Sequence, residues 1–184
     1  PTSGMKVYDP TVGSGGMLIQ MRHYLKKHGD DPKNISLNGQ ENNRGTWAIC
    51  RLNMFLQGVF NADIRYGDTL GDPKHLENGK IMLFDRVIAN PPFSLKKWGK
   101  DQADNDPYGR YPYGTPPKDA GDLAFIQHMI ASLKSDGSMG VVVPHGVLFR
   151  GSSEKEIRKG ILEDDLLEAV IGLPSALFYG TGIP

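Results

Sequence analysis

The segment Asn90-Pro91-Pro92-Phe93 contains the residue types needed to hold a nucleobase amine. Two successive prolines keep the backbone extended and remove two amide donors, so the Asn90 side chain and the Pro91 carbonyl can converge as acceptors. An exocyclic amine carries two N–H groups, which this pair of acceptors matches, and Phe93 offers a flat face for stacking. The alternative is a Pro-Pro strand terminator with Phe93 in the core.

A second candidate site is the glycine-rich segment that follows Asp9, comprising Thr11, Gly13, Ser14, Gly15 and Gly16. A glycine turn before a helix lets a cofactor approach the backbone and presents helix amides to a carboxylate or phosphate. The segment lacks the third glycine of the dinucleotide-binding fingerprint, since position 18 is Leu, and it lacks the Lys-Ser/Thr ending of a P-loop. Taken alone, it is equally compatible with a tight strand-to-helix turn.

Acidic residues follow two further predicted strands. Glu41, beside Asn42, can accept both ribose hydroxyls of a nucleoside. Asp68 can accept a hydrogen bond from an adenine amine, or it can cap the turn that follows it, which is the commoner role. Because ligands bind beyond the carboxyl ends of parallel strands, Asp9, Glu41 and Asp68 at three successive strand ends together favour a nucleoside cofactor.

Strands and helices alternate along the chain that must position these residues. Apolar and β-branched runs predict strands at 6–9, 35–41, 62–66, 84–89, 139–143 and 167–173. Helical spacing predicts helices at 17–29, 47–58, 122–137 and 153–162. The alternation predicts one α/β domain over residues 1–184, with a mostly parallel sheet, helices on both faces and right-handed crossovers.

For two of the helices, the sequence gives more specific expectations. Ser153 and Glu156 predict a capping box at the start of the last helix. The second helix is expected to bury one face, made of Trp47, Ala48, Leu52, Phe55 and Leu56.

Residues 94–118 have no periodicity and are rich in Pro and Gly, which predicts a long loop. The loop has a small positive excess and several aromatic side chains: Lys96, Lys97, Lys100, Arg110 and Lys118 against Asp101, Asp104 and Asp106, with Trp98, Tyr108, Tyr111 and Tyr113. Such residues can contact phosphates or splayed bases. A solvated, mobile loop whose aromatics pack locally is an equally good interpretation.

Length and composition exclude several classes of protein. The chain has 184 residues, of which 39% are hydrophobic, and it is neither a disulfide-stapled miniprotein nor a disordered tail. No run approaches the roughly 18 apolar residues of a spanning helix, and the lone Cys50 cannot form an internal disulfide, so we expect a cytoplasmic protein. His and Cys residues form no ligand cluster, and no metal is expected. The balance of 21 basic to 21 acidic residues gives no electrostatic reason to expect nucleic acid.

Taken together, these motifs resemble the amino-group DNA methyltransferases that use S-adenosylmethionine, and more narrowly the modification subunit of type I restriction-modification systems. The resemblance covers VYDPTVGSGGML (7–18), GQENN (39–43), GDTL (67–70), FDRVIANPPF (84–93), DLAFIQHMI, GVVVPHGVLFRG and LLEAVIGLPSALFYGTGIP (166–184). It implies a Rossmann-like fold and methyl transfer to the N6 atom of a flipped adenine in DNA. It also implies a specificity subunit and a restriction subunit as partners.

The resemblance further implies that the chain is a fragment, truncated at both ends. A Phe-x-Thr-Pro type segment and a helical domain would precede Pro1, and an antiparallel strand would follow the Thr-Gly-Ile-Pro turn. Two other interpretations share some of the features. An NAD-dependent dehydrogenase also has a strand, a glycine turn, a helix and an acid, and a fold-retaining fragment could act as a non-catalytic module that binds protein partners.

Overall fold

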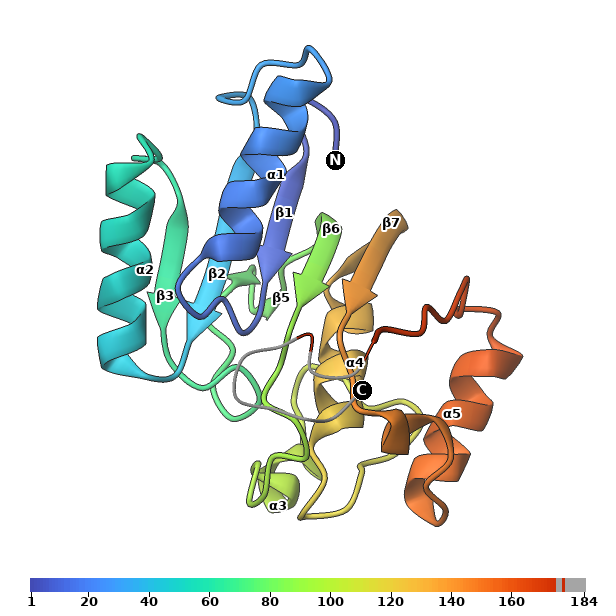
Figure 1. Cartoon of the computed structure of the whole chain (residues 1–184). Coiled ribbons are helices and arrows are strands. Elements are labelled where there is room, and N and C mark those ends of the chain that lie inside the picture. The colour runs from blue at the N-terminus through green and yellow to red at the C-terminus, as the bar shows by residue number, and fades with distance from the viewer. Residues whose placement is uncertain (175–176, 178–184) are drawn as a thin grey trace.

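A five-stranded parallel sheet forms the centre of the computed structural model, which describes residues 1–174 and 177 (Figure 1). Its strand order is β3 (Asp63–Tyr66), β2 (Ser36–Glu41), β1 (Lys6–Asp9), β6 (Phe84–Ala89) and β7 (Leu133–Val141). The chain runs outward from β1 to β3 and then returns to the other side of β1. The strand order therefore reverses between β1 and β6, the place where open parallel sheets bind ligands.

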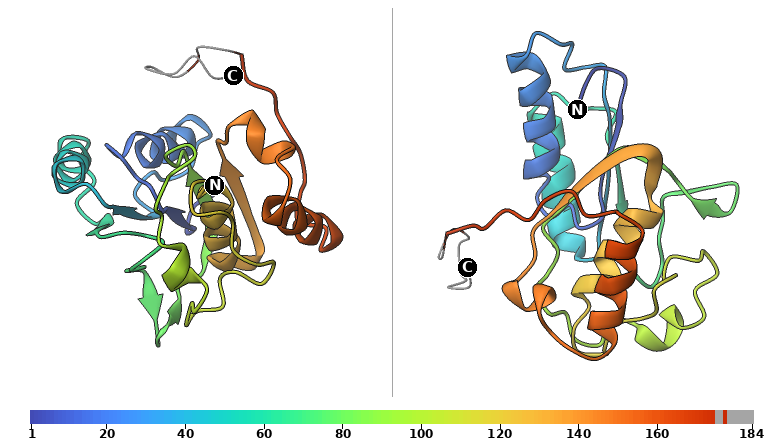
Figure 2. Two further views of the ribbon diagram at one scale, coloured as in Figure 1. Left: turned by 90° about the horizontal axis from the view of Figure 1, so that it is seen from below. Right: turned by 90° about the vertical axis from the view of Figure 1, so that its right-hand side faces the viewer.

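Helices cover both faces of the sheet (Figure 2). Helices α1 (Gly16–Lys27) and α2 (Arg44–Leu56) lie on one face, while α4 (Asp122–Ala131) lies on the other, with α5 (Ser153–Glu163) beside it. Two shorter elements and a hairpin complete the described fold: α3 (Lys100–Ala103), the 3-10 turn η1 (His145–Leu148), and the antiparallel pair β4 (Leu76–Glu77) and β5 (Lys80–Ile81). The expected Rossmann-like α/β architecture is confirmed.

Two apolar cores follow from the alternation of side chains along β1. Val7 is fully buried with Leu18 and Leu37 in the core under α1 and α2. Its neighbour Tyr8 points to the opposite face and packs with Phe84 and Met129 of the core under α4. Both faces of β1 are therefore buried, as expected of the central strand of a parallel sheet. None of the helices in the described part of the chain is long and apolar enough to span a bilayer.

The helix predicted at 122–137 is wrong in its second half. Helix α4 ends at Ala131, and β7 already begins at Leu133. The Ser132 hydroxyl donates to the His128 carbonyl at 2.8 Å, and the Phe84 N–H donates to the Ser132 carbonyl at 2.9 Å. The chain therefore leaves the helix and joins the edge of β6 within two residues.

The buried face predicted for α2 is also wrong in part. Leu52, Phe55 and Leu56 are 56%, 62% and 69% exposed, whereas Cys50 and Met54 are buried. Helical spacing fits either face of this helix, because apolar residues occur on both. The face that packs is the one whose side chains fit closely against the glycine turn before α1.

Two predictions near the end of the chain fail. Residues 167–173 form no strand, and Val170 and Ile171 are 58% and 81% exposed. An apolar run becomes a strand only beside another strand that accepts its backbone hydrogen bonds, and none of the described strands pairs with it. The capping box is wrong because the N-cap of α5 is Ser152, with no side-chain cap hydrogen bond. The Thr-Gly-Ile-Pro segment lies outside the described residues.

Candidate functional site

The predicted site residues meet at the carboxyl edge of the sheet. Tyr8 pairs with Val87 and Asp9 with Gly39, so Asp9 lies level with the end of β6 on one side and of β2 on the other. Asn90 follows directly after β6, and Glu41 ends β2. The structure therefore brings the glycine-rich segment, Glu41 and the Asn90–Phe93 segment to the switch point of the sheet.

The glycine turn is shaped by Gly15 and left open by its neighbours. Gly15 has φ +86°, and a Cβ there would lie 2.7 Å from Met54 Cε and 2.9 Å from Cys50 Sγ. Among the described residues, a Cβ at Gly16 would meet no atom within 4 Å, and one at Gly13 would meet only the Thr11 carbonyl oxygen, at 3.9 Å. Gly15 thus packs α1 against α2, while Gly13 and Gly16 line open space in front of α1.

Asp9 leaves an acceptor unused in the interior. It is 1% exposed, and its Oδ1 accepts the Thr11 N–H at 3.0 Å. Burial raises the pKa of the Asp9 carboxyl to about 7, and the nearby charge of Glu41 acts in the same direction. Among the residues that the structure describes, Asp9 Oδ2 and Thr11 Oγ1 have no hydrogen-bond partner, although buried polar atoms are normally paired. This pair of atoms suits a ligand with hydrogen-bond donors.

Glu41 fastens the end of β2 to the glycine turn. Its Oε2 accepts the Gly13 N–H at 3.1 Å and its Oε1 accepts the Asn43 N–H at 2.7 Å. Asn43 in turn caps α2, accepting the Thr46 N–H at 3.0 Å. Each carboxylate oxygen keeps a second lone pair for a ligand. Asn42 lies beside this group and is exposed, and Ser14 is exposed with its carbonyl accepting from Asn53 Nδ2.

Gly39 is a residue of this site that the motif pattern did not single out. A Cβ there would lie 2.8 Å from Val12 Cγ2, so the glycine lets the turn sit directly against β2.

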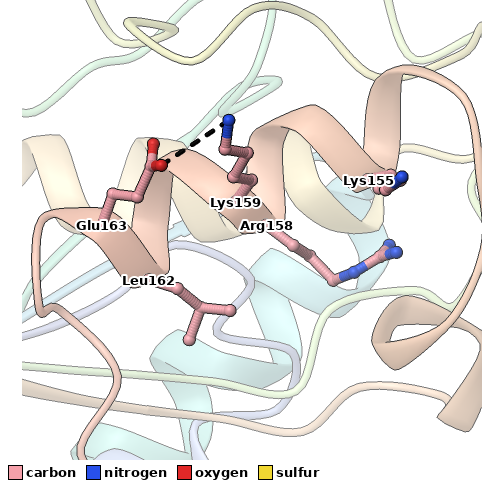
Figure 3. Close-up of a pocket in the computed structure, with 5 residues that line it drawn as sticks. All are labelled: Lys155, Arg158, Lys159, Leu162 and Glu163. Carbon is pink, nitrogen blue, oxygen red and sulfur yellow. Dashed lines mark ion pairs between the residues drawn. The ribbon is translucent and has the colours of Figure 1, made fainter.

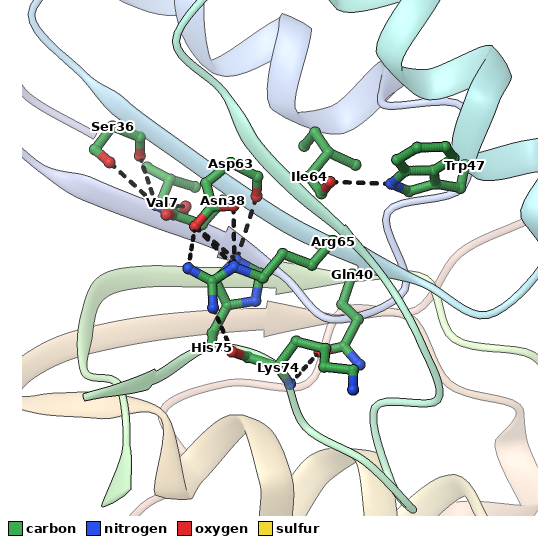
Figure 4. A network of polar contacts seen from close by, with 10 residues as sticks. All are labelled: Val7, Ser36, Asn38, Gln40, Trp47, Asp63, Ile64, Arg65, Lys74 and His75. Atoms are coloured by element: carbon green, nitrogen blue, oxygen red, sulfur yellow. Dashed lines mark hydrogen bonds and ion pairs between the residues drawn. The ribbon is translucent and has the colours of Figure 1, made fainter. Parts of the chain in front are cut away.

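Asp68 caps its own turn. It is exposed, and its Oδ1 accepts the Leu70 N–H at 3.1 Å. The adjoining Thr69 donates from its hydroxyl to the Pro10 carbonyl at 2.5 Å, which ties this turn to the glycine segment. Farther along, the Gln40 side-chain N–H donates to the Asp72 carbonyl at 2.9 Å. The Gln40 side-chain oxygen accepts the Lys74 N–H, also at 2.9 Å (Figure 4). The 67–74 connection is therefore held against the end of β2.

The 94–118 segment is a packed loop, anchored at the site by Arg110. This side chain is 3% exposed and donates to the Thr69 carbonyl at 3.0 Å and the Leu70 carbonyl at 2.8 Å. Its charge is paired with Asp106 at 2.7 Å. Nearby, His128 Nδ1 accepts a hydrogen bond from Arg110 Nη1. Burial lowers the pKa of His128 to about 3, which keeps the imidazole neutral.

Most of the loop's other candidate contact residues are used internally. Trp98 is 3% exposed, and its indole N–H donates to the Pro117 carbonyl at 2.8 Å. Lys100 and Lys118 form ion pairs with Asp104 and Asp101 at 2.8 Å. The expectation that the loop's aromatic side chains pack locally is therefore confirmed for Trp98, and Lys100 and Lys118 are paired within the loop. Lys96 and Lys97 are exposed and have no ion pair among the described residues.

The Asn90–Phe93 segment presents its polar end to solvent. Asn90 is exposed, Pro91 is buried and Phe93 is only partly buried, so Phe93 is not a core residue. The Ala89 carbonyl accepts the Val142 N–H at 3.0 Å, which fixes the start of the segment. The Ser94 N–H donates to Asp122 Oδ1 at 2.8 Å, which fixes its other end.

A shallow hollow lies away from the predicted site, on the outer side of α5. Its described lining consists of Lys155, Arg158, Lys159, Leu162 and Glu163, all from one helix (Figure 3). It contains none of the predicted site residues. Among the described residues, no group of three His, Cys, Asp or Glu side chains could hold a metal ion.

Comparisons with known proteins identify the family of the chain. The profile of the N-6 DNA Methylase family matches residues 1–184. The HindI methylase subunit of a type I restriction enzyme from Haemophilus influenzae is 37% identical over 186 residues, covering 100% of this chain and 40% of the relative. The MjaVII methylase subunit from Methanocaldococcus jannaschii is 39% identical over 188 residues, covering 97% of this chain and 31% of the relative. The chain thus spans less than half the length of these relatives.

Solved structures agree. A type I restriction-modification methyltransferase subunit from Streptococcus thermophilus superposes with a TM-score of 0.89 at 39% identity, covering 99% of this chain and 38% of that one. A class I S-adenosylmethionine-dependent methyltransferase from Listeria monocytogenes shares the fold, with a TM-score of 0.68 at 18% identity over 86% of this chain and 45% of that one. The chain therefore belongs to the N-6 DNA methylase family.

Proposed function

We propose that residues 1–184 form the catalytic core of a site-specific DNA adenine-N6 methyltransferase, the modification subunit of a type I restriction-modification system. The observation that carries the proposal is the meeting of two motifs at the switch point, where Asp9 ends β1 and Asn90 directly follows the adjacent strand β6. The family assignment agrees with it.

S-adenosylmethionine is the cofactor that the donor set fits. Asp9 Oδ2 and Thr11 Oγ1 are buried and have no partner in the described part of the chain, which suits the ammonium group of its methionine end. Open space in front of Gly13 and Gly16 leaves room beside the N-terminus of α1. Glu41, with Asn42 beside it, is placed for the ribose hydroxyls, and Asp68 for the adenine. Bound there, the cofactor supplies an electrophilic sulfonium methyl group.

Asn90 and Pro91 act on the target amine. The adenine amine is a poor nucleophile because its lone pair is delocalised into the ring. When Asn90 Oδ1 and the Pro91 carbonyl accept its two hydrogens, the nitrogen moves toward tetrahedral geometry and its lone pair becomes available for in-line attack. Pro92 keeps the backbone extended, and Phe93 stacks on the flipped base, offsetting part of the few kcal/mol that flipping costs. Positioning is the remaining contribution, and it can supply about 7 to 11 kcal/mol.

The partners follow from the same assignment. A specificity subunit would supply most duplex contacts, and a restriction subunit would complete the cleavage complex. The relatives named above come from a bacterium and an archaeon, whose DNA lies in the cytoplasm, and we place the protein there.

The substitution Asn90→Ala tests the proposal in the full-length protein assembled with its partner subunits. We expect methyl transfer to DNA from radiolabelled S-adenosylmethionine to be lost, while calorimetry shows cofactor affinity within about twofold of wild type, because Asn90 is not part of the glycine turn. Retained turnover would remove Asn90 from the mechanism. Wild-type protein that binds neither the cofactor nor DNA would instead support a non-catalytic protein-binding module.

A further inference from the structure

Asp122 joins two segments that are far apart in sequence. It is the first residue of α4, it is fully buried, and its two carboxylate oxygens have different partners. Oδ1 accepts the Ser94 N–H at 2.8 Å, and Oδ2 accepts Arg150 Nη1 at 2.8 Å. Arg150 follows η1, the turn after β7. One carboxylate therefore links the loop after β6 to the loop after β7.

Arg150 completes a closed network around the same loop. Its Nη2 donates to Ser94 Oγ at 3.1 Å, and its Nη1 also donates to Glu154 Oε1 at 3.2 Å. The hydrogen bond to Asp122 raises the pKa of Arg150, so it carries a full charge. The Arg150 carbonyl accepts Arg158 Nη2 at 2.6 Å, which holds the arginine backbone as well. Both the guanidinium and the backbone of Arg150 are thus held by hydrogen bonds.

Ser94 adopts a backbone conformation that needs such support. Its φ is +49°, in the left-handed region that residues with a Cβ rarely adopt. Conformations of this kind persist where the surroundings determine them, as two hydrogen bonds to Ser94 do here. Because Pro91 and Pro92 stiffen the segment, a position fixed at Ser94 is transmitted back to Phe93 and Asn90.

We propose that Asp122 and Arg150 are positioning residues for methyl transfer, which lock the downstream end of the Asn90–Phe93 segment so that its acceptors and its stacking face are preorganised for the flipped adenine. The inference rests on the proposed function. Neither side chain would touch the reacting atoms. Their contribution is made through the loop that they hold.

The chain offers a matched control for a purely structural effect. Asp85 also accepts a backbone N–H and a side-chain cation, from Lys6 at 2.7 Å and Lys134 Nζ at 2.6 Å. It lies near the start of β6, at the opposite end of the strand from Asn90. Substituting Asp85→Asn therefore disturbs the same kind of carboxylate without reaching the site.

The test compares Asp122→Asn, Arg150→Gln and Asp85→Asn in the full-length protein with its partner subunits. We expect the single-turnover rate of methyl transfer to fall roughly 10- to 100-fold in the first two, as expected of misplaced catalytic groups. Cofactor affinity should stay within about twofold. A 2-aminopurine at the target position should report less flipped base held in the site. Asp85→Asn should keep the wild-type rate even if its melting temperature falls by as much as those of the other two variants.

Arg150→Lys keeps the inference testable if the other variants fail to fold. A lysine retains the charge beside Asp122 but presents all its donors from one nitrogen and lacks the planar fork by which Nη1 and Nη2 of Arg150 reach separate partners, so we expect an intermediate rate and unchanged cofactor affinity. Rates within about threefold of wild type in the folded variants would overturn the inference. A wild-type protein without methyl transfer would overturn the proposed function instead, so the two failures are distinguishable.

Discussion

Replacing Gly16 by alanine separates folding from cofactor binding at the glycine turn. Gly16 is the first residue of α1, and a Cβ built on it meets no atom of the described residues within 4 Å. Alanine exceeds glycine in helix propensity by about 1 kcal/mol in a helix interior, and less at a helix end. We therefore expect the free energy of unfolding to stay the same or to rise slightly.

Cofactor binding should respond in the opposite direction. The added methyl group would occupy the open space in which we place S-adenosylmethionine. Overpacking of a close-fitting site by one methyl group costs about 1 to 3 kcal/mol. At about 1.4 kcal/mol per tenfold change, this weakens affinity roughly 5- to 150-fold.

Gly15→Ala provides the contrast, because its φ is +86° and its Cβ would meet Met54 and Cys50. A left-handed residue costs about 1 to 2 kcal/mol, to which overpacking adds about 1 to 3 kcal/mol. Thermal unfolding should show a melting temperature lower by about 4 °C or more. Calorimetric titration with S-adenosylmethionine and thermal unfolding of both variants complete the assay. If Gly16→Ala bound the cofactor like wild type, the cofactor would not occupy the space beside Gly16.

Two further predictions concern buried charges. Because burial raises the pKa of Asp9 from its ordinary 3.8 to about 7, the carboxyl group contributes stability below pH 4 that is lost as the pH rises to 7. Asp9→Asn should therefore raise the free energy of unfolding in urea at pH 8 and leave it nearly unchanged at pH 4, and an equal effect at both would contradict the shift. Arg110→Met should lower the free energy of unfolding by about 3 to 5 kcal/mol, because the Asp106 carboxylate is left buried without its partner. Lys118→Met, which breaks the exposed pair with Asp101, should leave urea denaturation unchanged, and similar losses in both variants would refute this role of Arg110.

The elements that carry the motifs could be predicted because their signals are local. The strands at 6–9 and 84–89 agree with β1 and β6, since short segments rich in apolar and β-branched residues predict buried strands and Asp9 or Asn90 then marks the strand end. The glycine turn was also predictable, because its conformation requires the residue that occupies it. Parallel pairing then brings these strand ends together without further information.

The packed face of α2 could not be predicted, since it depends on another segment. The face with Leu52 and Leu56 is the more apolar one, yet α2 turns Cys50 and Met54 inward. Gly15 leaves a hollow that a small thiol and a flexible thioether fill, with Cys50 Sγ and Met54 Cε within 3 Å of a Cβ built there. Shape at the turn decides the orientation, and hydrophobic spacing alone does not record shape.

The roles of the arginines at the site could not be predicted from the sequence, for a related reason. A lone charge in a Pro- and Gly-rich loop is usually solvated, but Arg110 reaches carbonyls 40 and 41 residues away, and Arg150 reaches Asp122 across 28 residues. Each holds a turn that a motif defines, Arg110 the one after Asp68 and Arg150 the one after Phe93. The ion pairs within 94–118 also consume most of the loop's positive charge and leave Lys96 and Lys97 exposed. A neutral count of charges is therefore compatible with the proposed function, in which the arginines shape the site and a partner subunit would supply most of the duplex contacts.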